Sequence, residues 1–143
     1  MLWTLGFAGL VGCGTTLPAG TAADRQALRE LAYPGMTPPF DGALDVVVER
    51  DGEMLTLQNR EARRLENAVL WLNQGYAGFL ETLPIGRPVR LPLQRFVNRH
   101  GETFPTGRFF APDLAETLLA AELLTPEGQR YRLTVLPDER WYE

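Results

Sequence analysis

The sequence contains no serine and no lysine, and it has a single histidine, His100, and a single cysteine, Cys13. These absences exclude a serine nucleophile, a Schiff-base lysine and a zinc site built from cysteine and histidine. A single cysteine also excludes a disulfide within the chain. Among the common catalytic schemes only carboxylate chemistry remains. We therefore predict a protein that is not an enzyme and that uses no metal and no cofactor.

The length and net charge of the chain limit the number of domains and the kinds of partner. The chain has 143 residues, 45% of them hydrophobic, which is enough for one domain with its own core. The net charge is -4, and all 14 basic residues are arginine. Nucleic-acid binding needs a clustered basic face, so we expect no nucleic-acid partner.

The N-terminal residues indicate where the protein resides. Residues 2–11 form an uncharged apolar run that is too short to span a bilayer but has the length of a signal-peptide core. The following Leu10-Val11-Gly12-Cys13 resembles the lipobox of bacterial lipoproteins. The alternative is a Gly-Cys pair within a hydrophobic N-terminal strand.

The lipobox resemblance implies a signal peptide over 1–12 and diacylglycerol on the sulfur of Cys13. It places the protein outside the cytoplasm, anchored to a membrane by lipid. Gly14 follows the cysteine in place of the aspartate that retains lipoproteins at an inner membrane. In a cell with two membranes, the outer membrane and the periplasmic side are therefore the default location.

Residues 13–42 read as the lipidated cysteine and a flexible tether, because threonine, proline, glycine and alanine are abundant there. Within this stretch residues 23–31 have the spacing of a short helix, with Ala27, Leu28 and Leu31 on one face. A helix this short is marginal alone, so we expect it to lie on the domain or to fray.

Residues 43–143 read as an all-β domain of about seven strands. Apolar alternation and turn residues predict strands over 44–50, 54–58, 67–73, 76–80, 87–93, 118–124 and 130–136. Asp51-Gly52 and Asn73-Gln74-Gly75 are hairpin signals, and Pro88 with Pro92 favours an edge position for its strand. Residues 118–124 have helical composition, but a short turn joins them to a clear strand, so a hairpin is predicted.

Two groups of aromatic residues attract attention. Trp71 alternates with Leu70 and Leu72 on a strand with two apolar faces, which predicts a core position. The candidate binding residues are Tyr76 and Phe79 in one aromatic segment, and Phe104, Phe109 and Phe110 in a long loop over 98–112. Three phenylalanines in one loop more often plug the end of a domain than bind a ligand. His100 in the same loop is predicted to be solvent-exposed and dispensable.

The order of these features resembles a known class of domain. A strand that ends at Asn59, the run from Leu65 to Asn73, the turn Leu83-Pro84-Ile85-Gly86 and an alternating edge strand are similar to immunoglobulin-like domains of the FxLYD type. The resemblance covers about residues 43–136. It implies a small antiparallel β-sandwich that serves as an interaction or spacer module, and no catalytic residues carry over.

Two functions are consistent with the sequence. The first is a non-catalytic, membrane-tethered interaction module that presents sandwich loops or an edge strand to another envelope protein. The second is a lipoprotein that binds a small ligand or carbohydrate through Tyr76 and the loop from Phe104 to Phe110. Aromatic side chains that line one concavity would favour the second function, whereas a flat polar face or an open edge strand would favour the first.

Overall fold

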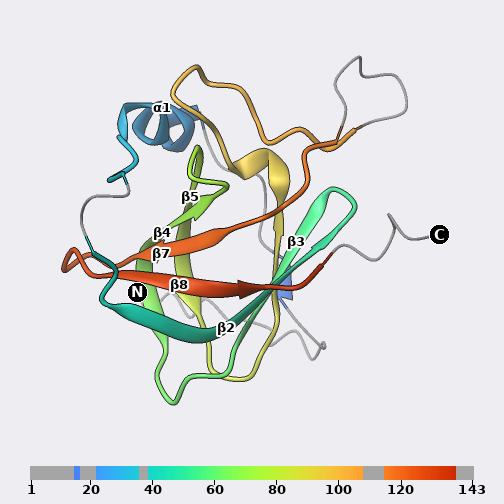
Figure 1. Cartoon of the computed structure of the whole chain (residues 1–143). Helices are drawn as coiled ribbons and strands as arrows, with labels where there is room; N and C mark the ends of the chain where they lie inside the picture. The colour runs from blue at the N-terminus through green and yellow to red at the C-terminus, as the bar shows by residue number, and fades with distance from the viewer. Residues whose placement is uncertain (1–14, 17–21, 36–38, 108–114, 138–143) are drawn as a thin grey trace, which may run out of the picture.

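The computed structural model describes residues 15–16, 22–35, 39–107 and 115–137. They form a mostly β protein with one short N-terminal helix (Figure 1). The elements are β1 (Thr15–Thr16), α1 (Ala22–Glu30), β2 (Gly42–Asp51), β3 (Met54–Asn59), β4 (Leu65–Leu72), β5 (Tyr76–Leu83), β6 (Val89–Pro92), the 3-10 turn η1 (Leu93–Arg95), β7 (Ala121–Leu124) and β8 (Arg130–Val135). In the described residues no helix is long and apolar enough to cross a membrane.

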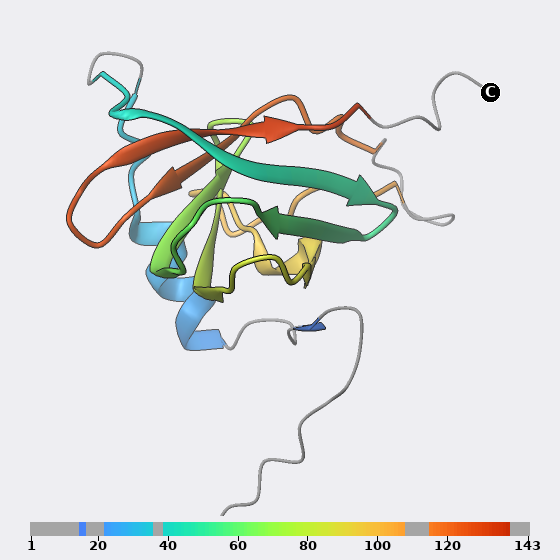
Figure 2. The same cartoon turned by 90° about the horizontal axis from the view of Figure 1, so that it is seen from below.

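All strands belong to one mixed sheet, in the order β1-β6-β3-β2-β8-β7-β4-β5. The seven strands β2 to β8 curl until the sheet is nearly closed into a barrel (Figures 1 and 2). Bridges from Asn59 to Ile85 and from Ala77 to Val97 link the two sides where the sheet approaches closure.

The prediction of an all-β domain of about seven strands with a short preceding helix is therefore confirmed. The prediction of an antiparallel two-sheet sandwich is wrong. β8 pairs with β2 in parallel, and a register shift between Ala43 and Val47 interrupts this pairing. Together with the antiparallel pairings of β8 to β7 and of β7 to β4, this contact makes the sheet continuous where a sandwich would have a gap.

The hairpin turns lie where the sequence predicts them. Asp51 pairs with Met54 across a two-residue turn, and Gly52 adopts φ 62, a conformation that glycine reaches without strain. Leu72 pairs with Tyr76 across the three-residue turn over 73–75. The predicted hairpin after residue 118 is also present, because Leu124 pairs with Arg130. Turn chemistry thus overrides the helical composition of this segment.

The barrel interior is an aliphatic core closed by two aromatic rings. Leucines of β3, β4, β5 and β6 are fully buried, as are Phe96 and Phe104. The Phe96 ring lies against Gly78 of β5 so closely that a Cβ at this position would approach its Cε1 to 2.5 Å. β5 therefore carries glycine where the ring passes over the backbone.

β4 buries both of its faces, as predicted. Ala68, Leu70 and Leu72 belong to the barrel core, and Trp71, at 5% exposure, belongs to a second cluster outside the barrel. That second cluster includes Leu28 of α1, which is buried, so the helix lies on the outer face of the sheet. Two parts of the stretch predicted as a tether, β1 and α1, thus contact the barrel.

Candidate ligand-binding groove

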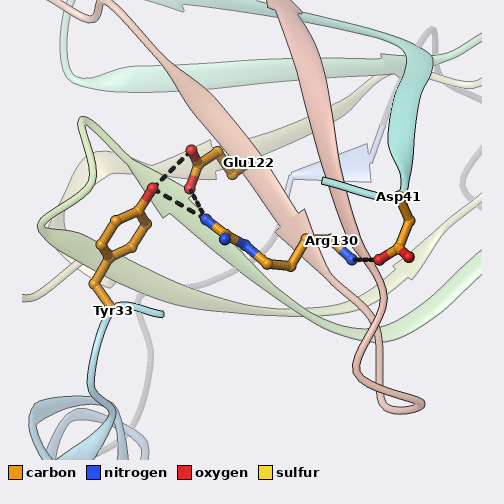
Figure 3. Close-up of polar contacts among 4 residues, drawn as sticks. All are labelled: Tyr33, Asp41, Glu122 and Arg130. Carbon is orange, nitrogen blue, oxygen red and sulfur yellow. Dashed lines mark hydrogen bonds and ion pairs between the residues drawn. The ribbon is translucent and has the colours of Figure 1, made fainter. Parts of the chain in front are cut away.

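The segment that follows α1 is fixed by a buried polar cluster (Figure 3). The hydroxyl of Tyr33 donates a hydrogen bond to Oε1 of Glu122 at 2.8 Å, and Nη2 of Arg130 donates to the Tyr33 hydroxyl at 3.2 Å. The same Nη2 lies 3.7 Å from Oε2 of Glu122, and the side chains of the ion pair are only 6% and 8% exposed. Since burying two charges costs solvation, such a pair persists only with supporting contacts.

Supporting contacts come from residues 40 and 41. Asp41 accepts a hydrogen bond from the backbone N–H of Arg130 at 2.8 Å, and its own N–H donates to the carbonyl of Arg130 at 2.8 Å. The guanidinium of Arg130 lies 4.3 Å from the centroid of the Phe40 ring. Burial raises the pKa of Tyr33 to about 12, and the hydrogen bond to Glu122 adds to the rise. Tyr33 therefore stays protonated and donates to the carboxylate.

Tyr33 also contacts Trp71. Their ring centroids are 5.4 Å apart and their planes meet at 74°, an edge-to-face arrangement. Nε1 of Trp71 is buried and has no hydrogen-bond partner among the described residues. The polar cluster thus places a second aromatic ring beside the outer face of β4, next to an indole donor that is not satisfied.

A groove of about 580 Å³ lies between the end of α1, the β4–β5 turn and the loop after Val97. Three aromatic residues contribute to its lining: Tyr33, Trp71 and Tyr76. Basic side chains come from two separate segments. The lining residues are Arg29, Glu30, Leu31, Ala32, Tyr33, Trp71, Gln74, Gly75, Tyr76, Asn98, Arg99 and His100.

Asn98 shapes the loop that carries two of these basic groups. Its Oδ1 accepts hydrogen bonds from the backbone N–H groups of His100 at 2.9 Å and Glu102 at 3.0 Å, and its Nδ2 donates to Glu102 Oε2 at 2.9 Å. This local closure fixes the turn that presents Arg99 and His100 to the groove. Nε of Arg99 donates to Nε2 of His100 at 3.3 Å.

The third basic group comes from the helix. The side chain of Arg29 lies over Gly101, where a Cβ would approach its Nε to 3.0 Å. Gly101 has φ 80, so glycine both permits the turn and leaves room for the guanidinium. In the described part of the chain neither Arg29 nor Arg99 forms an ion pair. The groove thus combines aromatic rings with guanidinium groups that remain available to an anion.

No family model, curated protein or solved structure matches this chain. The groove is therefore interpreted from its own residues. Within the residues that the structure describes, no group of three histidine, cysteine, aspartate or glutamate side chains could hold a metal ion. A second cavity of about 260 Å³, between Arg63 and Glu127, has no aromatic lining.

The structure brings one predicted binding residue to the groove. Tyr76 lines it, half-buried, and its ring meets Phe104 at 5.1 Å between centroids. Burial, followed by the charge of Glu116, raises the pKa of Tyr76. Phe104 itself is 1% exposed and belongs to the barrel core.

The structure describes only one of the remaining predicted site residues. Phe79 packs, partly buried, with the cluster beneath α1. Cys13, Phe109 and Phe110 lie outside the described residues. His100 is exposed, as predicted, but it lies at the groove.

Sequence reasoning missed Arg29, Tyr33 and Arg99 as lining residues. These residues come from two segments far apart in the sequence, and no spacing relates them. The helical periodicity that places Leu28 on the domain was the one available signal. It implies that residues directly after the helix also lie near the sheet surface.

Proposed function

We propose that this chain is a non-catalytic, membrane-tethered binding lipoprotein of the cell envelope, and that its groove binds an acidic carbohydrate. The observation that carries the proposal is the concave surface lined by Tyr33, Trp71 and Tyr76. Aromatic side chains in a concavity, together with a few placed polar groups, are typical of small-molecule sites.

The basic groups suggest the charge of the ligand. Guanidinium groups recognise carboxylates through paired hydrogen bonds, and Arg29 and Arg99 line the groove from two separate segments of the chain. Because guanidinium groups donate hydrogen bonds and do not accept them, Arg29 and Arg99 favour a ligand rich in oxygen acceptors. A sugar ring supplies a flat face for aromatic contact, and a uronic carboxylate supplies the anion.

Titration calorimetry tests this proposal on the full chain. The probes are an oligosaccharide of glucuronic acid and a neutral glucose oligosaccharide of equal length. We expect binding of the acidic probe, weakened at least severalfold in Arg29→Gln and in Arg99→Gln. Arg25→Gln is the matched control, because Arg25 is an exposed arginine on the same helix that does not line the groove. Equal weakening by the control, or equal binding of both probes, would refute the assignment.

The membrane tether has separate support. Leu10-Val11-Gly12-Cys13 resembles a lipobox, and a diacylglycerol on Cys13 would supply enough buried methylene groups for stable attachment. The phospholipid donor would lose its phosphate headgroup as the S–C bond forms. Fractionation of cells that express Cys13→Ala tests this part: a variant as membrane-bound as the parent would disprove lipidation at this residue.

A protein partner is the second candidate function, and the outer edge of β5 favours it. β5 is the last strand in the sheet order. Beyond its pairing with β4, the described residues add a bridge from Ala77 to Val97, and the carbonyls of Phe79 and Leu83 accept hydrogen bonds from Arg95 and Asn59. A partner strand could pair with the part of this edge around Glu81. Cross-linking in the intact envelope would identify such a partner through residues exposed on β5, such as Glu81.

A further inference from the structure

The pairing of β1 restricts where a lipid on Cys13 can lie. β1 pairs with β6 in parallel, with Thr15 opposite Val89 and Thr16 opposite Arg90. Cys13 precedes Thr15 by two residues in the sequence, and two residues of chain reach at most about 8 Å. Parallel strands begin at the same end of a sheet, which for β6 is the end where the β5–β6 loop enters.

That end of the barrel carries an exposed apolar residue. Ile85, in the β5–β6 loop, is 54% exposed, whereas most large apolar side chains of the described residues are buried. Its position is fixed: Ile85 bridges to Asn59, and the N–H of Gly86 donates to the Asn59 carbonyl at 2.9 Å.

Asn59 connects this loop with the β3–β4 loop beside it. Its fully buried amide Nδ2 donates to the carbonyls of Arg63 at 2.8 Å and Leu83 at 3.2 Å. Its Oδ1 accepts from the N–H of Glu61 at 2.9 Å. The two loops therefore form one surface, and Ile85 projects from a stiff support.

Basic groups flank this isoleucine. Arg60 and Arg87 are exposed on the two loops, and neither forms an ion pair among the described residues. The carboxylate of Glu61 in the β3–β4 loop accepts the N–H of Asp45 at 2.7 Å. Exposed apolar and basic side chains on neighbouring loops favour binding to the interface of an anionic bilayer.

We propose that the end of the barrel formed by the β3–β4 and β5–β6 loops rests on the bilayer, with Ile85 inserted between lipids beside the acyl chains on Cys13. This inference rests on the proposed lipidation. It replaces a domain suspended on a long tether with one held at the surface, because β1 leaves only Gly14 between Cys13 and the barrel.

The proposed orientation of the barrel on the bilayer determines which way the groove faces. The groove lies at the β4–β5 turn, and β5 runs from this turn to the β5–β6 loop (Figure 1). Eight residues of strand span roughly 25 Å. The groove therefore opens toward the aqueous side, away from the membrane that holds the protein.

Depth-dependent fluorescence quenching tests this orientation. The full lipidated chain is placed in vesicles of phosphatidylcholine and phosphatidylglycerol, with an environment-sensitive dye on Ile85→Cys. Leu119→Cys is the matched control, because Leu119 is an exposed leucine, 77% accessible, beside Asn73 at the other end of β5. The lipidated Cys13 has no free thiol, so the dye reports one position.

We expect spin-labelled lipids to quench the dye at position 85 severalfold more than the dye at position 119, and aqueous iodide to show the reverse order. Equal quenching at both positions in protein that floats with the vesicles would overturn the orientation while leaving lipidation intact. Protein that fails to float would overturn lipidation and the orientation that depends on it.

Discussion

The buried ion pair between Glu122 and Arg130 allows the sharpest test of the structure. In Glu122→Ala the guanidinium of Arg130 remains, 6% exposed, without its carboxylate. Removing one partner of a buried pair typically costs about 3–5 kcal/mol. The Tyr33 hydroxyl loses its acceptor in the same variant. We expect the free energy of unfolding to fall by about 3–5 kcal/mol, a large share of the roughly 5–15 kcal/mol of an ordinary domain.

Urea denaturation followed by circular dichroism measures this loss. With a slope of about 2 kcal/mol per molar urea, the midpoint should fall by roughly 2 M. The control is Glu66→Ala, which breaks the pair with Arg64, whose side chains are 62% and 53% exposed. An exposed pair contributes about 0.2–1 kcal/mol, so this midpoint should barely move.

A third variant distinguishes the loss of a charge partner from the removal of both buried charges. Glu122→Leu with Arg130→Met replaces both charges by apolar side chains of similar length. Such replacements are often neutral or stabilising, so we expect the double variant to unfold at higher urea than Glu122→Ala. If Glu122→Ala loses no more stability than Glu66→Ala, the side chains of Glu122 and Arg130 are not buried together, and the position assigned to Tyr33 is wrong.

Three further predictions concern other contacts. The pKa of Tyr33 is raised from 10.0 to about 12. The hydroxyl of Tyr33 therefore contributes its full share of stability below pH 10, and this contribution is lost as the pH rises toward 12. The stability of Tyr33→Phe, measured by urea titration, should depend less on pH over this range. Gly78→Ala would force the Phe96 ring aside and should lower the free energy of unfolding, measured by thermal denaturation, by about 1–3 kcal/mol. At Gly128 an added Cβ would have no atom within 4 Å, so Gly128→Ala tests the effect of backbone strain alone. Asn59→Ala removes three hydrogen bonds of a buried side chain and should cost about 2–4 kcal/mol, with faster hydrogen exchange at the N–H of Glu61. An unchanged exchange rate would contradict the connection of the β3–β4 and β5–β6 loops through Asn59.

The features that the sequence predicted correctly are local. Asp51-Gly52 and the turn at 73–75 specify their hairpins through backbone conformations that few residues adopt, and both turns are present. The core position of Trp71 followed from the two apolar faces of its strand. Each of these inferences needs only residues within one strand or one turn.

The arrangement of the sheet could not be predicted in the same way. The parallel contact of β8 with β2 joins Tyr131 to Gly42 and Thr134 to Val47, pairs separated by most of the domain. Apolar alternation is the same for a strand of a sandwich and a strand of a barrel, so the pattern specifies faces and not neighbours.

The groove was only partly predictable for a related reason. Tyr76 was predicted as a binding residue because it is an aromatic residue beside a turn. Phe104 was predicted as a binding residue too, but it is buried in the barrel core. The buried charges of Glu122 and Arg130 were also missed, because charged residues are ordinarily exposed and only the tertiary fold brings them together. Sites assembled from distant segments leave little trace in local sequence.

The place of β7 and β8 in the sheet has a consequence for synthesis of the protein. These two strands lie between β2 and β4, and they come from residues 121–135, which follow all the other strands in the sequence. A nascent chain that lacks them leaves β2 and β4 each with an unpaired edge on this side of the barrel. This side of the barrel is therefore completed only after the β7–β8 hairpin has been synthesised. A chain that cannot complete its barrel until so late exposes unpaired strand edges while it emerges from the ribosome.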